Sequence, residues 1–185
     1  MKHSLVKQRY AKSLLDLALD LNQVEEVKND MLTLIQTAED TRELKVMLRS
    51  PIIKPDDKVA ILSKVFEEKV CPLTHQFMVL LAKKKREELL LEIGETYLSL
   101  YKVHKGIKTA YLTTSRALNP EVRERVLTRL ADQTGAEIEL VENIDTDLIG
   151  GFILRVDDKQ IDASMRGELK KIAREFEENL YIKAF

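Results

Sequence analysis

Apolar residues recur at every third or fourth position from Leu5 to His104, which is the period of an α-helix. Prolines divide this stretch. Ser50 precedes Pro51, and the residue before a proline disfavours the helical conformation, whereas Pro55 suits the first turn of a new helix. We therefore predict six helices, at about residues 4–21, 23–38, 44–49, 55–71, 73–83 and 90–104.

The period changes after Gly106, where β-branched and aromatic residues occupy every second position. This alternation predicts a strand at about 107–113 and a domain boundary before it. A helix at about 120–135, further strands and a last helix complete the pattern. The sequence thus predicts an α+β fold, with a six-helix bundle over residues 1–105 and a smaller α/β domain over residues 106–185, in the order β-α-β-β-β-α.

Two adjacent glycines, Gly150 and Gly151, stand in an alternating apolar run over residues 148–156. Because both alternating sets are apolar, we predict that the glycines lie within a strand covered on more than one side. Glycine weakens a strand but lets a backbone or a helix approach closely, so we assign the pair to close packing. Ser164 is placed to cap the last helix. The predicted buried stripe of that helix consists of Met165, Leu169, Ile172, Phe176 and Leu180.

The first and fifth helices are more apolar than a small bundle requires. The first carries two adjacent apolar stripes, of which only one must face the core, and the fifth is apolar nearly all round. One interpretation is that the fifth helix is the central, enclosed member of the bundle. The other is that the two helices flank a groove that receives an amphipathic helix from a partner.

Composition favours a folded protein with protein partners. The chain of 185 residues is 44% hydrophobic and 33% charged, and its net charge of -1 gives no general attraction to nucleic acid or to anionic membranes. The basic run at residues 83–86 is interpreted as a solvated helix end, or as a positive rim that orients an acidic partner. Nucleic-acid binding is the weakest interpretation, because no aromatic residues interleave with this run. Cys71 is interpreted as a small core hydrophobe.

No pattern of residues predicts catalysis, a cofactor or a metal site. The histidines lie far apart in the sequence, and it lacks the motifs of a nucleophilic serine, a phosphate loop or a zinc helix. The aspartates within residues 157–162 lack the spacing of a calcium loop. The sequence begins without a signal or membrane-spanning run, so we expect a cytoplasmic chain that does not insert into a membrane. These observations argue against an enzyme.

Three segments carry a resemblance to a known family. They are the R-Y-A-K-S-L run at residues 9–14, the L-R-S-P run at residues 48–51, and the paired glycines followed by I-D-x-S and R-G-x-L segments. Together they resemble the delta subunit of bacterial F-type ATP synthase, the counterpart of the mitochondrial oligomycin-sensitivity-conferring subunit. Ser13 and Ala163 depart mildly from the family's usual residues. The signature of the C-terminal domain comprises Gly150, Gly151, Asp162, Ser164 and Arg166.

The resemblance implies a non-catalytic stator subunit, which links the F1 catalytic hexamer to the peripheral stalk of a proton-translocating complex. It implies that the first and fifth helices bind the N-terminal helix of an alpha subunit, and that the C-terminal domain binds the C-terminal helices of b subunits. The expected location is peripheral, on the cytoplasmic face of the bacterial inner membrane, with no nucleic acid or small-molecule substrate. The alternative is a free-standing adaptor that binds another amphipathic helix. The predicted partner-binding residues are Tyr10, Ala11, Leu14, Leu15, Phe77, Leu80, Leu81 and Lys84.

Overall fold

The computed structural model of the protein describes residues 2–177. The chain divides into two compact units, Met1–Lys105 and Gly106–Phe185. The division falls at the residue where the hydrophobic period changes from that of helices to that of strands. We describe each unit by itself.

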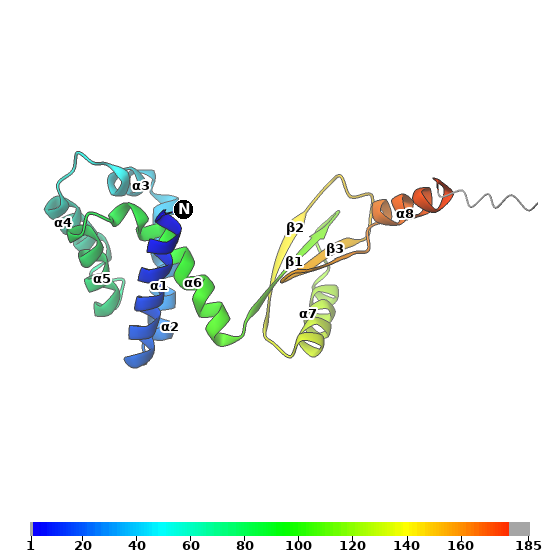
Figure 1. Cartoon of the computed structure of the whole chain (residues 1–185), viewed down its shortest axis with the longest axis horizontal. Helices are drawn as coiled ribbons and strands as arrows, with labels where there is room; N and C mark the ends of the chain where they lie inside the picture. Colours follow the sequence, from blue (N-terminus) through cyan, green and yellow to red (C-terminus); the bar gives the residue numbers. More distant parts are fainter. Residues whose placement is uncertain (1, 178–185) are drawn as a thin grey trace, which may run out of the picture. The chain divides into compact units, whose positions relative to one another are not determined.

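The first unit is built from helices alone within the described residues (Figure 1). They are α1 (Lys2–Asp20), α2 (Val24–Asp40), α3 (Arg42–Arg49), α4 (Pro55–Phe66), α5 (Pro72–Lys83), the short 3-10 helix η1 (Glu87–Leu89) and α6 (Leu90–Lys105). The end of α4 at Phe66 differs from the predicted end near Cys71. The reason is that Cys71 has an extended backbone and caps α5, with its Sγ accepting a hydrogen bond from the Thr74 backbone N–H at 3.5 Å.

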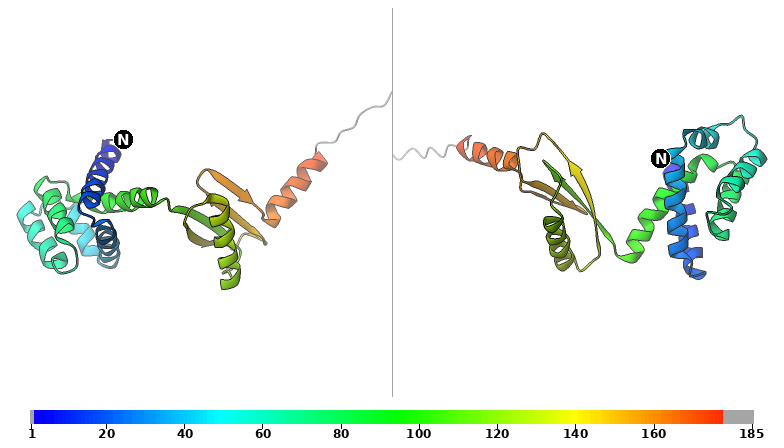
Figure 2. Two further views of the ribbon diagram at one scale, coloured as in Figure 1. Left: turned by 90° about the horizontal axis from the view of Figure 1, so that it is seen from below. Right: turned by 180° about the vertical axis from the view of Figure 1, so that it is seen from behind.

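The central helix of this unit is α6, which packs against both α1 and α2 (Figures 1 and 2). Its Leu90, Ile93 and Tyr97 side chains are fully buried. The Tyr97 hydroxyl donates a hydrogen bond to the Val24 carbonyl oxygen at 3.3 Å, and burial raises the pKa of this phenol. Of the two interpretations of the fifth helix, the one that makes it the enclosed member is therefore wrong, because α6 occupies that place.

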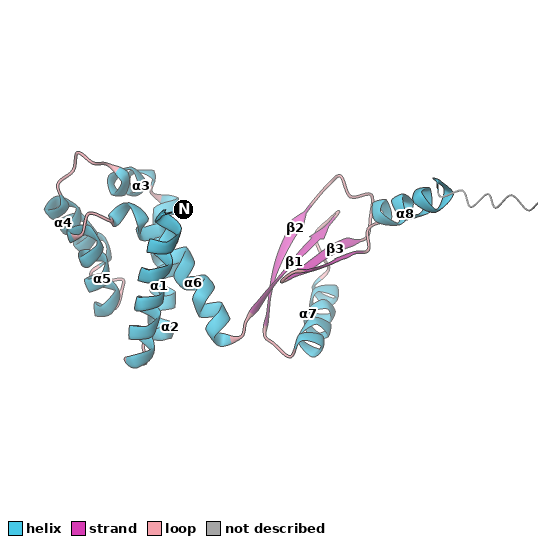
Figure 3. Ribbon diagram, in the orientation of Figure 1, coloured by secondary structure: helices cyan, strands magenta, loops and turns pink. Residues whose placement is uncertain are grey.

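The second unit combines a sheet with two helices (Figure 3). Within the described residues the sheet has four strands, β1 (Lys108–Thr114), β2 (Ile138–Ile144), β3 (Phe152–Val156) and β4 (Lys159–Asp162), in the order β2-β1-β3-β4. β1 pairs in parallel with β2 and antiparallel with β3, and β3 pairs antiparallel with β4. The protein is therefore of mixed α and β structure, as an α+β fold requires. In chain order, α7 (Pro120–Thr134) lies between β1 and β2, and α8 (Met165–Glu177) follows β4.

One face of the sheet is covered by α7. Leu130 of this helix packs in a core with Ala110, Leu112 and Leu154 of the two central strands. On the opposite face the guanidinium of Arg155 lies 5.0 Å from the centre of the Tyr111 ring. No described helix covers that face, so the prediction of a strand covered on more than one side is wrong.

The glycine pair lies in a bend before β3, and its predicted place within a strand is wrong. Gly151 has a φ of 78°, a left-handed conformation that favours glycine. A Cβ atom at this position would lie 2.2 Å from the backbone oxygen of Ala163. Next to it, the Met165 backbone N–H donates to the Gly150 carbonyl oxygen at 3.1 Å. Gly151 therefore does serve close packing, against the backbone that leads into α8, whereas an added Cβ at Gly150 would meet only the Met165 side chain, at 3.4 Å.

Asp162 and Ser164 form the joint between β4 and α8. The Asp162 Oδ1 atom accepts hydrogen bonds from the Ser164 backbone N–H at 2.9 Å and from its hydroxyl at 2.6 Å, and these bonds lower the pKa of the carboxyl group. The Ser164 Oγ atom in turn accepts from the Gly167 backbone N–H at 3.0 Å. The predicted cap at Ser164 is thus confirmed. Arg166 has an exposed side chain.

The predicted buried stripe of the last helix is wrong for the residues that can be tested. Met165, Leu169 and Ile172 are 49%, 56% and 48% exposed. The side chain of Phe176 and the whole of Leu180 lie outside the described residues. Figures 1 and 2 show α8 extending away from the sheet, while α7 packs on it. The helix therefore carries an apolar face that this unit does not cover within the described residues.

Candidate helix-binding groove

A groove of about 690 Å³ opens between α1 and α5. Most of its lining side chains are apolar, and Leu17 and Leu80 are each 45% exposed at its walls. A continuous apolar surface of this kind is typical of an interaction site. The lining residues are Val6, Arg9, Tyr10, Ser13, Leu14, Leu17, Leu73, Gln76, Phe77, Leu80 and Arg86.

The two apolar stripes of α1 face different surroundings. Ala11 and Leu15 belong to the stripe that is buried in the core of the bundle. Tyr10 and Leu17 belong to the stripe that lines the groove. Leu14 lies between the two, since it is almost fully buried and still forms part of the groove wall. The double stripe thus lets one helix serve both the core and the groove.

The α5 helix is also apolar on two sides. Met78 and Leu81 are fully buried, whereas Leu73, Phe77 and Leu80 line the groove. The apolar residues all round this helix therefore reflect two different surfaces and not enclosure by neighbouring helices.

Four of the predicted partner-binding residues line the groove, and four do not. Ala11, Leu15 and Leu81 lie in the core, with exposed fractions of 0%, 7% and 0%, so their assignment to the groove is corrected. Each is one position away from a residue of the wall, and one step along a helix turns a side chain by about 100°. Lys84 is exposed but lies outside the lining set. The four that line the groove are Tyr10, Leu14, Phe77 and Leu80.

A cluster of two aromatic rings and a guanidinium joins the two walls. The rings of Tyr10 and Phe77 meet edge to face, with centroids 6.3 Å apart and an interplanar angle of 67°. The Arg86 Nη1 atom donates a hydrogen bond to the Tyr10 hydroxyl at 2.9 Å, and the guanidinium lies 5.5 Å from the centre of the same ring. Sequence reasoning grouped Arg86 with three lysines in a basic run, so its place in the groove was missed.

The start of α5 is attached to α2 through a buried carboxylate. Asp30 is 7% exposed, and its Oδ2 atom accepts a hydrogen bond from the Cys71 backbone N–H at 2.9 Å. Burial raises the pKa of the Cys71 thiol, which favours its neutral form. Cys71 is half-buried and acts as a helix cap, so its interpretation as a simple core hydrophobe is incomplete.

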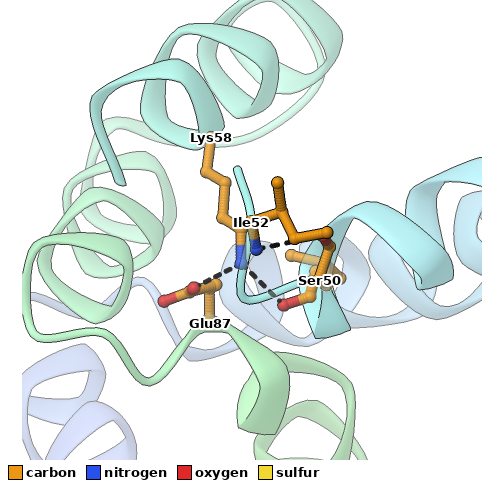
Figure 4. A network of polar contacts seen from close by, with 5 residues as sticks. Ser50, Ile52, Lys58 and Glu87 are labelled. Carbon is orange, nitrogen blue, oxygen red and sulfur yellow. Dashed lines mark hydrogen bonds and ion pairs between the residues drawn. The ribbon is translucent and has the colours of Figure 1, made fainter. Parts of the chain in front are cut away.

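A buried ion pair holds α4 against the segments on either side of it (Figure 4). The Lys58 Nζ atom donates to the Leu48 carbonyl oxygen at 3.0 Å and to the Glu87 Oε1 atom at 2.5 Å. Lys58 thereby links the end of α3 to η1, directly after Arg86. The Glu87 Oε2 atom is buried and has no hydrogen-bond partner among the described residues. The sequence contains no sign that this lysine is buried, because it stands among other charged residues.

The C-terminal unit presents a second apolar surface. It includes the exposed face of α8, represented by Leu169 and Ile172. Phe152 of β3 and Ile161 of the edge strand β4 are also exposed. We call the exposed apolar residues Leu169 and Ile172 of α8 the C-terminal apolar surface.

The described residues contain no group of three or more His, Cys, Asp or Glu side chains that could hold a metal ion. Among them there is also no helix with the length and apolarity needed to cross a membrane.

Comparison with known proteins agrees with the resemblance. The profile of the family "ATP synthase delta (OSCP) subunit" matches residues 6–176. The ATP synthase subunit delta of Christiangramia forsetii is 34% identical to the chain and covers 98% of both sequences, and that of Cytophaga hutchinsonii is 35% identical over 97% of this chain and 98% of its own. A chain of the Toxoplasma gondii mitochondrial ATP synthase has a similar fold, with a TM-score of 0.73 at 20% identity, over 92% of this chain and 96% of its own. The protein thus belongs to the ATP synthase delta (OSCP) subunit family and is a non-catalytic stator subunit of the peripheral stalk.

Proposed function

We propose that the groove between α1 and α5 binds the N-terminal helix of an ATP synthase alpha subunit. The observation that carries the proposal is the groove itself, because its two apolar walls match the apolar face of one amphipathic helix. The core-facing residues of both helices are already buried in the bundle. The residues of the walls therefore remain available to a partner.

The same proposal assigns the C-terminal apolar surface to the C-terminal helices of the b subunits. The exposed face of α8 has the helical spacing of a surface that packs against another helix. In this arrangement one unit contacts the catalytic hexamer and the other contacts the stalk. The chain would then be peripheral, held at the cytoplasmic face of the bacterial inner membrane through the complex.

A stator of this kind works by resisting torque without chemistry of its own. Rotation of the central shaft pulls on the catalytic hexamer, and the hexamer must be kept from turning with it. The relevant property is slow dissociation of each contact. A nanomolar contact corresponds to a binding free energy of about -12 kcal/mol, which one well-packed helix with anchored aromatic contacts can approach.

Leu80→Asp is expected to weaken peptide binding at least tenfold, or by about 1.4 kcal/mol. The peptide is synthetic and has the sequence of the N-terminal helix of the alpha subunit. The reason is that a carboxylate would be placed in the apolar wall and lose its hydration when the peptide docks. Leu80 is half-exposed in the free protein, so the bundle should stay folded. Isothermal titration calorimetry measures the affinity.

Leu32→Asp is the matched control for this variant. Leu32 lies on α2, has nearly the same exposure as Leu80 and does not line the groove. It should leave the affinity unchanged. Equal losses in the two variants, or no loss in a folded Leu80→Asp protein, would contradict the groove assignment.

Leu169→Gln is expected to reduce binding of a fragment from the C-terminal end of the b protein about tenfold, because it removes a large apolar side chain from the face of α8. Lys170→Gln places the same side chain one position further along the same helix and should have little effect. Biolayer interferometry with the immobilised fragment compares the two dissociation rates. Equal rates would exclude α8 as the contact.

The alternative function, a free-standing adaptor for another amphipathic helix, uses the same groove. The two functions differ in what the protein binds in its own cell. A stator subunit is expected to co-purify with the catalytic hexamer in stoichiometric amount, and a free-standing adaptor is not. Purification of the hexamer without this chain from an otherwise intact membrane preparation would favour the adaptor.

A further inference from the structure

The charges that line the groove are all of one sign. Two arginines, Arg9 and Arg86, belong to the lining set, and no aspartate or glutamate does. The remaining lining residues are apolar or neutral. A partner helix that fills the groove therefore meets positive charge without a compensating acid on the wall.

Arg86 is held in place before any partner arrives. One of its N–H groups is bound to the Tyr10 hydroxyl, and its guanidinium lies 5.5 Å from the centre of the same ring, which itself packs against Phe77. A guanidinium has five N–H donors, so most of them remain available. Within the described residues Arg86 forms no ion pair with a carboxylate. The side chain is thus an exposed cation that contacts Tyr10 and lacks an anionic partner.

Docking of an apolar helix would remove water from this guanidinium. An arginine that loses water without gaining an acceptor destabilises the complex, whereas a carboxylate can accept two parallel hydrogen bonds from the guanidinium. Because Arg86 is already ordered by Tyr10, little conformational entropy is lost when such a pair forms. The groove therefore favours a helix with an acidic side chain at this position over one with a neutral side chain.

The length of the groove limits the position of this acidic residue on the partner helix. Its α1 wall extends from Val6 to Leu17, which corresponds to about three helical turns or about 16 Å. Tyr10, which carries the bound guanidinium, is about one turn from the Val6 end of this wall. On the partner helix, the acidic residue that pairs with Arg86 is accordingly expected about one turn from one end of a three-turn apolar stripe.

We propose that Arg86 is a specificity residue, which selects partner helices that carry a carboxylate beside the apolar stripe at the level of Tyr10. The proposal rests on the proposed function, because it specifies the chemistry of the helix that the groove accepts. It adds a charge requirement to a site whose shape and apolarity alone would accept many amphipathic helices.

The test is a double-mutant cycle between the full chain and synthetic peptides made as the N-terminal helix of the alpha subunit. In the peptides each Asp is changed singly to Asn and each Glu singly to Gln. One of these changes is expected to weaken binding to the unaltered protein about tenfold and to have almost no effect on binding to Arg86→Gln. Arg86→Lys should fall between the two, since it keeps the charge and loses the paired donors.

Lys12→Gln is the control on the protein side. Lys12 is an exposed cation on α1 that does not line the groove, so this variant should respond to the peptide changes as the unaltered protein does. The comparison among peptides on the unaltered protein does not depend on the folding of any variant, and circular dichroism checks that each protein variant is folded.

Two results would overturn the proposal, and only one of them would also contradict the proposed function. If every peptide binds the unaltered protein with the same affinity, the charge requirement is wrong and the groove assignment stands. If none of the peptides binds at all, the proposed function fails together with the specificity assigned to Arg86.

Discussion

Lys58→Met is expected to lower the free energy of unfolding of the N-terminal unit by about 3–5 kcal/mol. In the native protein Lys58 is almost fully buried and neutralises Glu87, whose second carboxylate oxygen has no hydrogen-bond partner among the described residues. Removal of the ammonium would leave a buried carboxylate with neither a counter-charge nor a donor. The Leu48 carbonyl oxygen would also lose its hydrogen bond from Lys58.

Amide hydrogen exchange followed by mass spectrometry measures this effect, because it reports the opening of each unit separately. Protection should fall in α4 and α6 and remain unchanged in the sheet. The double variant Lys58→Met/Glu87→Leu should recover more than half of the loss, since the removal of both charges avoids the unpaired carboxylate. A loss below about 1 kcal/mol in the single variant would mean that the ion pair is solvated.

Gly151→Ala is expected to destabilise the C-terminal unit by about 3 kcal/mol, the second largest effect that we predict. The added Cβ would stand 2.2 Å from the Ala163 oxygen and 2.8 Å from the Ser164 Cα atom, and both are backbone atoms that cannot rotate away. The left-handed φ of Gly151 adds a further cost for any residue with a side chain. The expected result is loss of exchange protection in β3, β4 and the first turn of α8.

Alanine substitutions at two other glycines separate the cost of the left-handed backbone from the cost of the steric clash. At Gly135, where φ is 62° and no atom lies within 4 Å of an added Cβ, alanine tests the backbone cost alone, about 1 kcal/mol. At Gly150 an added Cβ would meet only the flexible Met165 side chain, at 3.4 Å, so alanine should be nearly neutral. If Gly151→Ala costs no more than Gly135→Ala, the Ala163 backbone yields and the close approach is not rigid.

The helices and the boundary between the units could be predicted because both depend on local rules. Pro55 begins α4, and the side chain of Asn119 caps α7 by accepting a hydrogen bond from the Glu121 backbone N–H at 3.2 Å. The groove helices could be predicted as well, because α1 and α5 carry more apolar surface than one core needs. The hydrophobic period and the capping of helix ends depend on residues that are neighbours in the chain, so both can be recognised from a single sequence.

The features that could not be predicted depend on what lies next to a residue in space. Leu14 and Leu15 are equally apolar, and only the packing of α1 shows that Leu14 reaches the groove. Lys58 and Arg86 belong to charged runs, and the fold alone reveals that one is buried and that the other contacts Tyr10. The apolar stripe of α8 predicts a buried face, and that prediction is wrong because within the described residues this chain supplies no surface that buries it.

The single covalent passage between the two units has a mechanical consequence. The chain crosses from one to the other at Lys105 and Gly106, where α6 ends shortly before β1 begins. α6 is the helix that packs against both α1 and α2, and β1 has a hydrogen-bonded strand on each side. Tension applied across the passage would therefore pull on an interior element in each unit, so that yielding requires shearing of the helical core or of the sheet, and not the peeling of an edge.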